Sequence, residues 1–208
     1  MERFYTSTRN HSFKISAKAA IKKGFADDKG LFVLPDLQEN HIDIAKLPDL
    51  SYQEIANLVL EQLLPDFDHT EIADSVQLAY GNNFTDSEIT PVNNVDNFHV
   101  LELFHGPTAA FKDIGLQLLP QLMQHSLSPN NQVMILTATS GDTGKAALEG
   151  FKDQPQIGIT VFYPHKGSVK FSNSKWPLRV VTILMSLLFR VISMMLKQTL
   201  NDFLITAI

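Results

Sequence analysis

The chain has 208 residues, a formal net charge of −5 at pH 7 from 17 basic and 22 acidic side chains, and no cysteine. The acidic balance argues against nucleic acid as a partner, and the lack of cysteine excludes disulfides, a thiolate nucleophile and Cys-ligated zinc. The seven histidines have no paired spacing that would indicate a metal site, and the opening "MERFYTSTRN" has no apolar stretch typical of a secretory signal, so we expect a cytoplasmic protein without a bound metal.

The composition changes sharply near Gly167. Residues 1–167 hold 21 of the 22 acidic and 12 of the 17 basic side chains, a formal charge of −9, whereas residues 168–208 have a formal charge of +4. The last 41 residues also lack glycine and contain the only tryptophan. We therefore interpret the two parts separately.

The beginning of the chain predicts a short helix followed by a strand. The stretch "SAKAAIKKG" is typical of a short amphipathic helix, and the apolar run "LFVLP" after it is typical of a strand that ends at Pro35. Further on, Ser51 and Glu54 have the spacing of a capping box, and apolar residues then recur at helical spacing until Pro65.

A second helix is expected from His69 to about Tyr80. Residues 81–97 are rich in Asn, Asp and Thr with little apolar periodicity, which predicts a loop. We place a domain boundary in this loop. Residues 1–82 are then expected to form a small, mostly helical N-terminal domain.

Residues 83–167 show strand and helix patterns in alternation. The order is the strand "FHVLELF", a helix from about Thr108 to Gln124, the strand "QVMILTAT", the helix "GKAALEGF" and the strand "GITVFYP". Such βαβαβ alternation predicts a parallel sheet with helices on its faces, and ligands at the carboxyl ends of its strands. The expected fold class is α/β, with the helical domain followed by the start of a parallel-sheet domain that is incomplete.

The first turn of chemical interest is "FHGPTAAFKDIGLQLL". Pro107 ends the preceding strand, Thr108 is a candidate N-cap, and Lys112 is expected in the first turn of the helix. The partial positive charge of a helix N-terminus favours the neutral amine, which is the form that reacts with an aldehyde. The alternative is a solvated lysine with Asp113 as a neighbouring charge.

The same helix has two expected faces. One face is polar and expected to be exposed: Gln117, Gln121 and Gln124. The other is apolar and expected to be buried: Phe111, Ile114, Leu118 and Leu122. Lys112 lies near the buried face.

The second turn, "TATSGDTGKAALEG", joins a strand to a helix. Backbone N–H groups in a glycine-containing turn of this kind can bind phosphate or carboxylate. The spacing of Gly141 and Gly144 fits neither a P-loop nor a G-x-G-x-x-G dinucleotide turn. A purely structural turn rich in Ser and Thr is the alternative.

The stretches "ELFHGPTAAFKDIGLQLL", "TATSGDTGKAALEGF" and "VFYPHKG", together with "FYTSTRN" and "KGLFVLP" near the start, resemble threonine synthase over residues 1–167. The resemblance implies an enzyme that uses pyridoxal 5'-phosphate, a carbon–oxygen lyase acting on a phosphate ester. It implies that O-phospho-L-homoserine and water give L-threonine and phosphate. Fold-related pyridoxal-phosphate enzymes of β-elimination or β-replacement are the alternative.

The resemblance also implies roles for particular residues. Lys112 is then the lysine that binds the cofactor aldehyde covalently. The turn of Ser140, Gly141, Asp142, Thr143 and Gly144 matches the family's S-G-D-T-G turn, which lies against the cofactor ring and the substrate carboxylate. Residues 83–167 are accordingly expected to be a partial catalytic domain.

The end of the chain raises a separate question. Leu178–Leu196 has 19 residues, enough to cross a membrane, and a non-enzymatic tail-anchored protein is therefore an alternative for the whole chain. Arg179 and Arg190 interrupt the run, and a central arginine costs about 2.5–3.5 kcal/mol on insertion scales. We expect no membrane partner.

A shifted reading frame accounts for residues 168–208. Read one base out of frame with allowed codons, Gly167–Trp176 gives V-S-K-I-Q-Q-L-Q-M and Arg190–Lys197 gives G-N-F-D-D-A-Q, similar to segments of threonine synthases. Some positions leave little freedom, because Met194 followed by Met195 forces Asp. We expect an out-of-frame tail and a truncated, inactive enzyme.

Overall fold

The computed structural model describes residues 3–37, 41–139 and 141–162. The chain divides into two compact units. The first comprises Met1–Pro91 and Gln121–Pro129, and the second comprises Val92–Pro120 and Asn130–Ile208. The expected tail and the membrane-span alternative, both within residues 168–208, lie outside the described residues.

The first unit opens with a small antiparallel sheet in the strand order β2-β1-β3. Its strands are β1 (Tyr5–Ser7), β2 (Asn10–Ile15) and β3 (Phe32–Val33). The expected strand "LFVLP" is confirmed as β3, whereas β1 and β2 were not predicted. Between β2 and β3, α1 (Ala17–Lys23) confirms the expected short helix.

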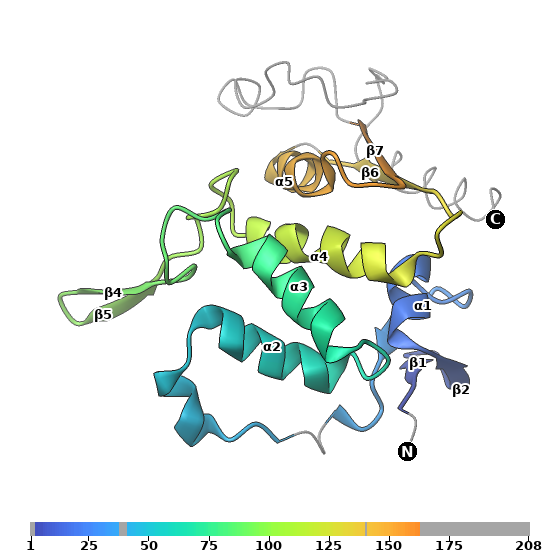
Figure 1. Ribbon diagram of the computed structural model, residues 1–208, viewed down its shortest axis with the longest axis horizontal. Coiled ribbons are helices and arrows are strands. Elements are labelled where there is room, and N and C mark those ends of the chain that lie inside the picture. The colour runs from blue at the N-terminus through green and yellow to red at the C-terminus, as the bar shows by residue number, and fades with distance from the viewer. Residues whose placement is uncertain (1–2, 38–40, 140, 163–208) are drawn as a thin grey trace. The chain divides into compact units, whose positions relative to one another are not determined.

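Two helices follow the sheet, after a 3₁₀ turn (η2, Ile44–Asp49). They are α2 (Tyr52–Leu63) and α3 (His69–Tyr80), and they pack on each other (Figure 1). The predicted capping box at the start of α2 is confirmed, because Ser51 Oγ accepts the N–H of Glu54 while the Glu54 carboxylate accepts the N–H of Ser51. Four buried side chains of α3 contribute to the core of this unit: Ile72, Val76, Ala79 and Tyr80.

The second unit begins with a hairpin of β4 (Val92–Val95) and β5 (Phe98–Leu101). The two strands pair antiparallel, from Val92 opposite Leu101 to Val95 opposite Phe98. The prediction that "FHVLELF" is the first parallel strand is therefore wrong, and the expected loop 81–97 contains a strand. Asp96 and Asn97 form the two-residue connection, with Asp96 at φ 53°, as hairpin turns of this length require.

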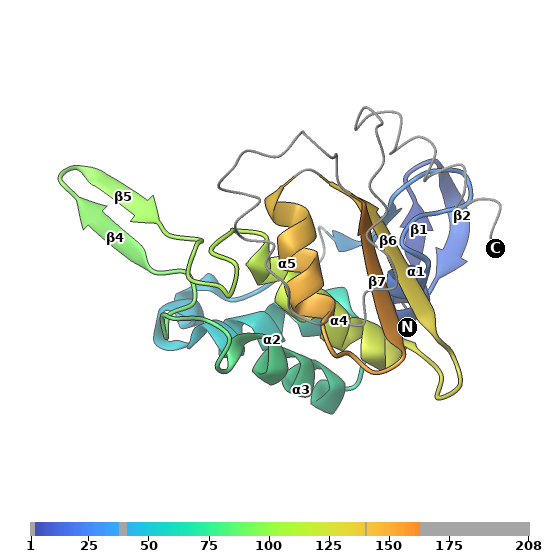
Figure 2. The same ribbon diagram turned by 90° about the horizontal axis from the view of Figure 1, so that it is seen from above.

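The parallel part of the second unit matches the prediction. β6 (Val133–Ala138) and β7 (Ile157–Phe162) pair parallel along their whole length, and α5 (Asp142–Phe151) connects them. The helix lies against this strand pair (Figure 2). Both elements contribute buried apolar side chains: Ala146, Ala147 and Phe151 of α5, and Ile157, Ile159 and Val161 of β7. The expected α/β class with the start of a parallel sheet is confirmed.

The helix α4 (Asp113–Ser126) starts five residues later than predicted. The expected faces are accordingly wrong at two positions: Phe111 precedes the helix and is 60% exposed, whereas Gln117 is 7% exposed. The physical reason is that the buried stripe begins at Asp113 and continues through Gln117 and Pro120, at helical spacing. Leu122 is buried as expected. Within the described residues, no helix is long and apolar enough to cross a membrane.

Candidate active site

Lys112 is the last residue before α4. Its backbone carbonyl accepts the N–H of Leu116 at 2.9 Å, which is the first hydrogen bond of the helix, so Lys112 holds the N-cap position rather than a place in the first turn. The side chain is half-buried, and its Nζ lies 4.4 Å from the centroid of the exposed Phe111 ring. The primary amine of Lys112 thus lies beside the aromatic ring of Phe111, at the N-terminal end of α4.

The residues before Lys112 form a closed turn held by Asp113. The backbone N–H of Thr108 donates to Asp113 Oδ2 at 2.8 Å, and Thr108 Oγ1 donates to Asp113 Oδ1 at 2.6 Å. The expectation that Thr108 caps a helix is therefore wrong: its hydroxyl donates to a carboxylate within the turn instead of accepting an N–H of the helix. Sequence reasoning treated Asp113 only as a neighbouring charge and missed this role.

The second predicted turn lies at the carboxyl end of β6. Ser140 is outside the described residues, Gly141 precedes α5, and Asp142, Thr143 and Gly144 form its first turn. Gly141 N–H donates to Thr139 Oγ1 at 3.4 Å, and Gly144 N–H donates to the Gly141 carbonyl at 3.2 Å. Among the described residues, no atom lies within 4 Å of the position that a Cβ on Gly141 would take, so the turn is open on that side.

Both turns belong to the second unit, and the helices that follow them are in contact. A Cβ on Gly150 of α5 would overlap the backbone carbonyl of Leu116 in α4 and would lie 3.6 Å from Pro120 Cγ. The two helix backbones can approach this closely only because residue 150 has no side chain. The site assignments of Lys112, Ser140, Gly141, Asp142, Thr143 and Gly144 stay predictions.

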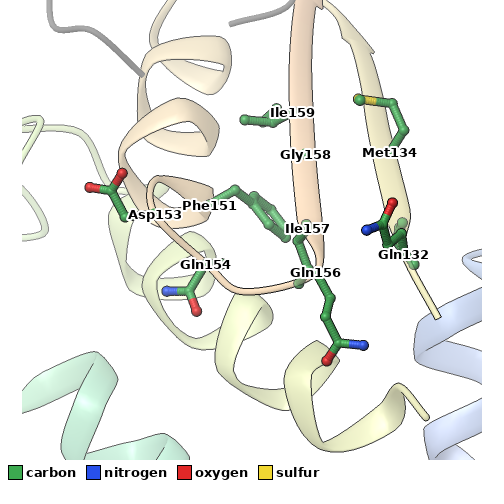
Figure 3. Close-up of a pocket in the computed structure, with 10 residues that line it drawn as sticks. Gln132, Met134, Phe151, Asp153, Gln154, Gln156, Ile157, Gly158 and Ile159 are labelled. Carbon is green, nitrogen blue, oxygen red and sulfur yellow. The ribbon is translucent and has the colours of Figure 1, made fainter. Parts of the chain in front are cut away.

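A cavity of about 430 Å³ lies elsewhere in the second unit. Figure 3 shows its lining, which includes Gln132 and Met134, the end of α5 at Phe151, and Gln156–Ile159. Apart from the end of α5, this lining lies at the amino ends of β6 and β7, whereas ligand sites of open parallel sheets lie at the carboxyl ends. The cavity contains none of the predicted site residues. In the described part of the chain, no group of three His, Asp or Glu side chains is placed to hold a metal ion.

Comparison with known proteins identifies the relatives of this chain. Residues 4–80 match the family model described as the threonine synthase N terminus. A human protein named threonine synthase-like 1 is 38% identical over 176 residues, which cover 78% of this chain and 24% of that protein. Threonine synthase of Saccharomyces cerevisiae is 37% identical over 184 residues, 77% of this chain and 35% of the relative.

The folds agree as well. A crystal structure of PLP-bound threonine synthase from Brucella melitensis matches with a TM-score of 0.84 at 28% identity, over 97% of this chain and 45% of that one. The chain thus spans a quarter to about a third of the length of these curated relatives, and under half of the solved structure. Sequence and fold together establish that the chain contains a threonine synthase N-terminal portion.

Proposed function

We propose that this chain carries the lysine-bearing part of a threonine synthase that uses pyridoxal 5'-phosphate and acts on O-phospho-L-homoserine. The observation that supports this most is the place of Lys112, which directly precedes α4 in a turn held by the buried Asp113. That turn lies in the stretch "HGPTAAFKD", on which the resemblance to the family rests. The bound PLP of the Brucella melitensis relative supports the choice of cofactor.

The chemistry of the residues present fits pyridoxal phosphate. The cofactor has an aldehyde, and Lys112 Nζ is a primary amine of the kind that adds to aldehydes. The open side of Gly141 leaves room for a planar ring or a carboxylate beside the start of α5. Backbone N–H groups at a helix start favour such an anion. When bound, the cofactor supplies an electron sink for the carbons of the substrate.

The chain's own residues would then divide two tasks. Lys112 Nζ would take and return protons at Cα and Cβ of the substrate, as a base that stays within reach of both carbons. The turn from Ser140 to Gly144 would bind the substrate carboxylate through its N–H groups and orient those carbons toward the amine. The close packing of α5 on α4 at Gly150 would keep the two turns at a constant separation.

The proposed reaction breaks the bond between Cγ and the phosphate oxygen. Cβ loses a proton and forms a bond with the oxygen of water, Cγ gains a proton, and the second proton of water leaves with the phosphate, so that O-phospho-L-homoserine and water give L-threonine and phosphate. This is lyase chemistry on a phosphate ester. A fold-related β-elimination enzyme would instead release ammonia and an oxo acid, which separates the two functions in one product analysis.

We also propose that residues 1–82 and 83–167 are two domains of this enzyme and that residues 168–208 are an out-of-frame translation. The change of formal charge from −9 to +4 at residue 167 supports the second point. The alignments with the human and yeast relatives cover 78% and 77% of this chain. These shares are close to the 80% of the sequence that residues 1–167 make up, which also supports the proposal for residues 168–208. A reducing cytoplasm suits the lack of cysteine.

The test of the lysine assignment is optical. The chain is incubated with pyridoxal phosphate, and a band in the visible range that borohydride abolishes is expected. Lys112→Ala should lose this band, since the turn held by Asp113 lies beside Lys112. Lys152→Ala, which changes a lysine near Glu149 at the end of α5, is the matched control and should retain it. A band of full intensity in Lys112→Ala would show that the lysine assignment is wrong.

A further inference from the structure

The carboxylate of Asp113 is buried in an unusual way. The side chain is 0% exposed, and within the described part of the chain it makes no ion pair. Its partners are all in the turn before it: the N–H and Oγ1 of Thr108, and the N–H of Ala110 at 3.4 Å. Buried carboxylates are ordinarily paired with a cation, because leaving water is costly for a charge. Here three hydrogen bonds from Thr108 and Ala110 take the place of that cation.

The turn is shaped around this carboxylate. A Cβ on Gly106 would overlap the Asp113 side chain, so the backbone at residue 106 passes directly over it. Ala109 has φ 55°, a left-handed conformation that residues other than glycine seldom adopt. Such a conformation persists only where the surrounding bonds enforce it, and the bonds from Thr108 and Ala110 to Asp113 lie on both sides of Ala109.

Two backbone hydrogen bonds beside this turn hold the backbone of Lys112. Asp113 N–H donates to the Ala110 carbonyl at 3.0 Å, and the Lys112 carbonyl accepts the first helical N–H from Leu116. The backbone on both sides of the Lys112 Cα is therefore held, and only its side-chain torsions remain to be set. In this structure the side chain places Nζ 4.4 Å from the centroid of the Phe111 ring.

We propose that Asp113 is a positioning residue, whose buried carboxylate holds the Thr108–Lys112 turn and so sets the place of the Lys112 amine. The inference rests on the proposed function of Lys112 and extends it to a residue that does not itself meet the cofactor. A positioned amine needs no large rearrangement before it reacts, which is how orientation contributes to catalysis.

The experiment compares four variants of the full chain. Asp113→Ala removes every side-chain bond between residue 113 and the turn, and leaves the backbone bond from its N–H to the Ala110 carbonyl. Asp113→Asn keeps the geometry, because the amide oxygen can accept the two N–H groups while its NH₂ donates to the Thr108 hydroxyl. Thr108→Val is nearly isosteric and removes one hydroxyl only. Asp153→Asn, at an exposed aspartate of the same unit, is the control for loss of a carboxylate.

Two measurements are made on each variant. Amide hydrogen exchange reports the N–H groups of Thr108 and Ala110. Trapping with pyridoxal phosphate and borohydride reports the amine: Nζ adds to the aldehyde, water leaves, and hydride reduces the resulting C=N bond. Peptide mass analysis then gives the fraction of Lys112 modified, relative to the exposed Lys46 in the same molecules.

We expect Asp113→Ala to lower the ratio of modified Lys112 to Lys46 by more than about tenfold and to speed exchange at both amides, since it removes several bonds to a charged group and a single such bond contributes roughly a factor of ten. Thr108→Val should lower the ratio by a smaller factor. Asp113→Asn should stay within about twofold of the parent, because it retains the contacts, and Asp153→Asn should match it. If circular dichroism shows that Asp113→Ala does not fold, the comparison of Lys112 trapping in Thr108→Val and in the parent tests the positioning role.

The outcomes separate the inference from the function that it extends. Equal Lys112 trapping in the parent and in Asp113→Ala, or in Thr108→Val where that variant decides, would overturn the positioning role alone. A parent chain whose Lys112 is trapped no more than Lys46 would overturn the proposed role of the lysine and the positioning role with it. A loss in Asp113→Asn as large as in Asp113→Ala would show that charge, and not the held turn, acts on the amine.

Discussion

At the scale of single residues, Asp28 joins a turn to the first strand. Ser7 Oγ donates to both carboxylate oxygens of Asp28 at 2.8 Å, and the N–H of Gly30 donates to Oδ1 at 2.8 Å. A Cβ on Gly30 would overlap Ser7 Oγ, so a side chain at this position would displace the Ser7 hydroxyl from its place beside Asp28. The bond from Ser7, followed by the bond from Gly30, holds the pKa of the Asp28 carboxyl below its usual value.

This lowered pKa predicts a pH dependence of folding. A carboxyl with a lower pKa in the folded state stabilises the protein above the unfolded pKa of about 3.9 and loses that contribution as the pH falls through the folded value. We expect the free energy of unfolding to fall as the pH is lowered from about 4, and Asp28→Asn to flatten part of that decrease. Urea midpoints between neutral pH and pH 3 measure it.

The neighbouring Asp27 provides the control. Its side chain is 82% exposed and pairs with Lys23 at the surface, so Asp27→Asn should retain the slope of the parent. Acid slopes that are the same in Asp28→Asn and the parent would contradict the assigned role of the Ser7–Asp28 bonds.

At the scale of elements, two helix glycines have opposite surroundings. Gly150 of α5 contacts the backbone of α4 at Leu116, and an added Cβ would overlap the carbonyl oxygen. Gly115 of α4 has no atom within 4 Å of an added Cβ, in the part of the chain that the structure describes. Backbone atoms cannot move aside as a side chain can, so the contact at Gly150 fixes the separation of the two helices.

The contrast between the two glycines predicts opposite effects of alanine. Gly150→Ala should destabilise the second unit by about 1–3 kcal/mol or more, because it forces α4 and α5 apart. Gly115→Ala should stabilise it by about 0.5–1 kcal/mol, the gain from replacing glycine in a helix interior. Chemical denaturation followed by circular dichroism gives both changes. A neutral effect of Gly150→Ala would mean that the two helices do not pack backbone to backbone.

At the scale of the whole molecule, the elements that could be predicted from the sequence are those specified by short stretches of neighbouring residues. The capping box of Ser51 and Glu54 and the periodic apolar residues after it specify α2 without reference to the rest of the chain. The parallel pair β6 and β7 was predictable because a helix pattern separates two apolar runs. The hairpin was not, because "FHVLELF" alternates equally well in either kind of sheet, and its partner strand, Val92–Val95, is half asparagine.

The candidate site was predictable only in part. Lys112 and the turn from Ser140 to Gly144 came from a family resemblance, and their roles stay predictions. The start of α4 was predicted wrongly because Thr108 and Asp113 are both residue types common at helix starts, and only the three-dimensional turn shows that the threonine donates to the aspartate. Nothing in the local pattern indicated that this aspartate is fully buried.

We expect the 208-residue chain to be inactive as an enzyme. If residues 168–208 are out of frame, their side chains were not selected to complete the parallel sheet or to contact the cofactor, and this chain should form no threonine from O-phospho-L-homoserine. Adding one base at the Gly167 codon should yield a product that forms threonine and phosphate in equal amounts, with Lys112→Ala in that product as the inactive control. Gene sequencing from independent isolates shows whether the G-N-F-D-D-A-Q segment is encoded in the shifted frame. Threonine formation by the 208-residue chain itself would refute the interpretation of its last 41 residues, because a tail with no selected function could not complete an active site.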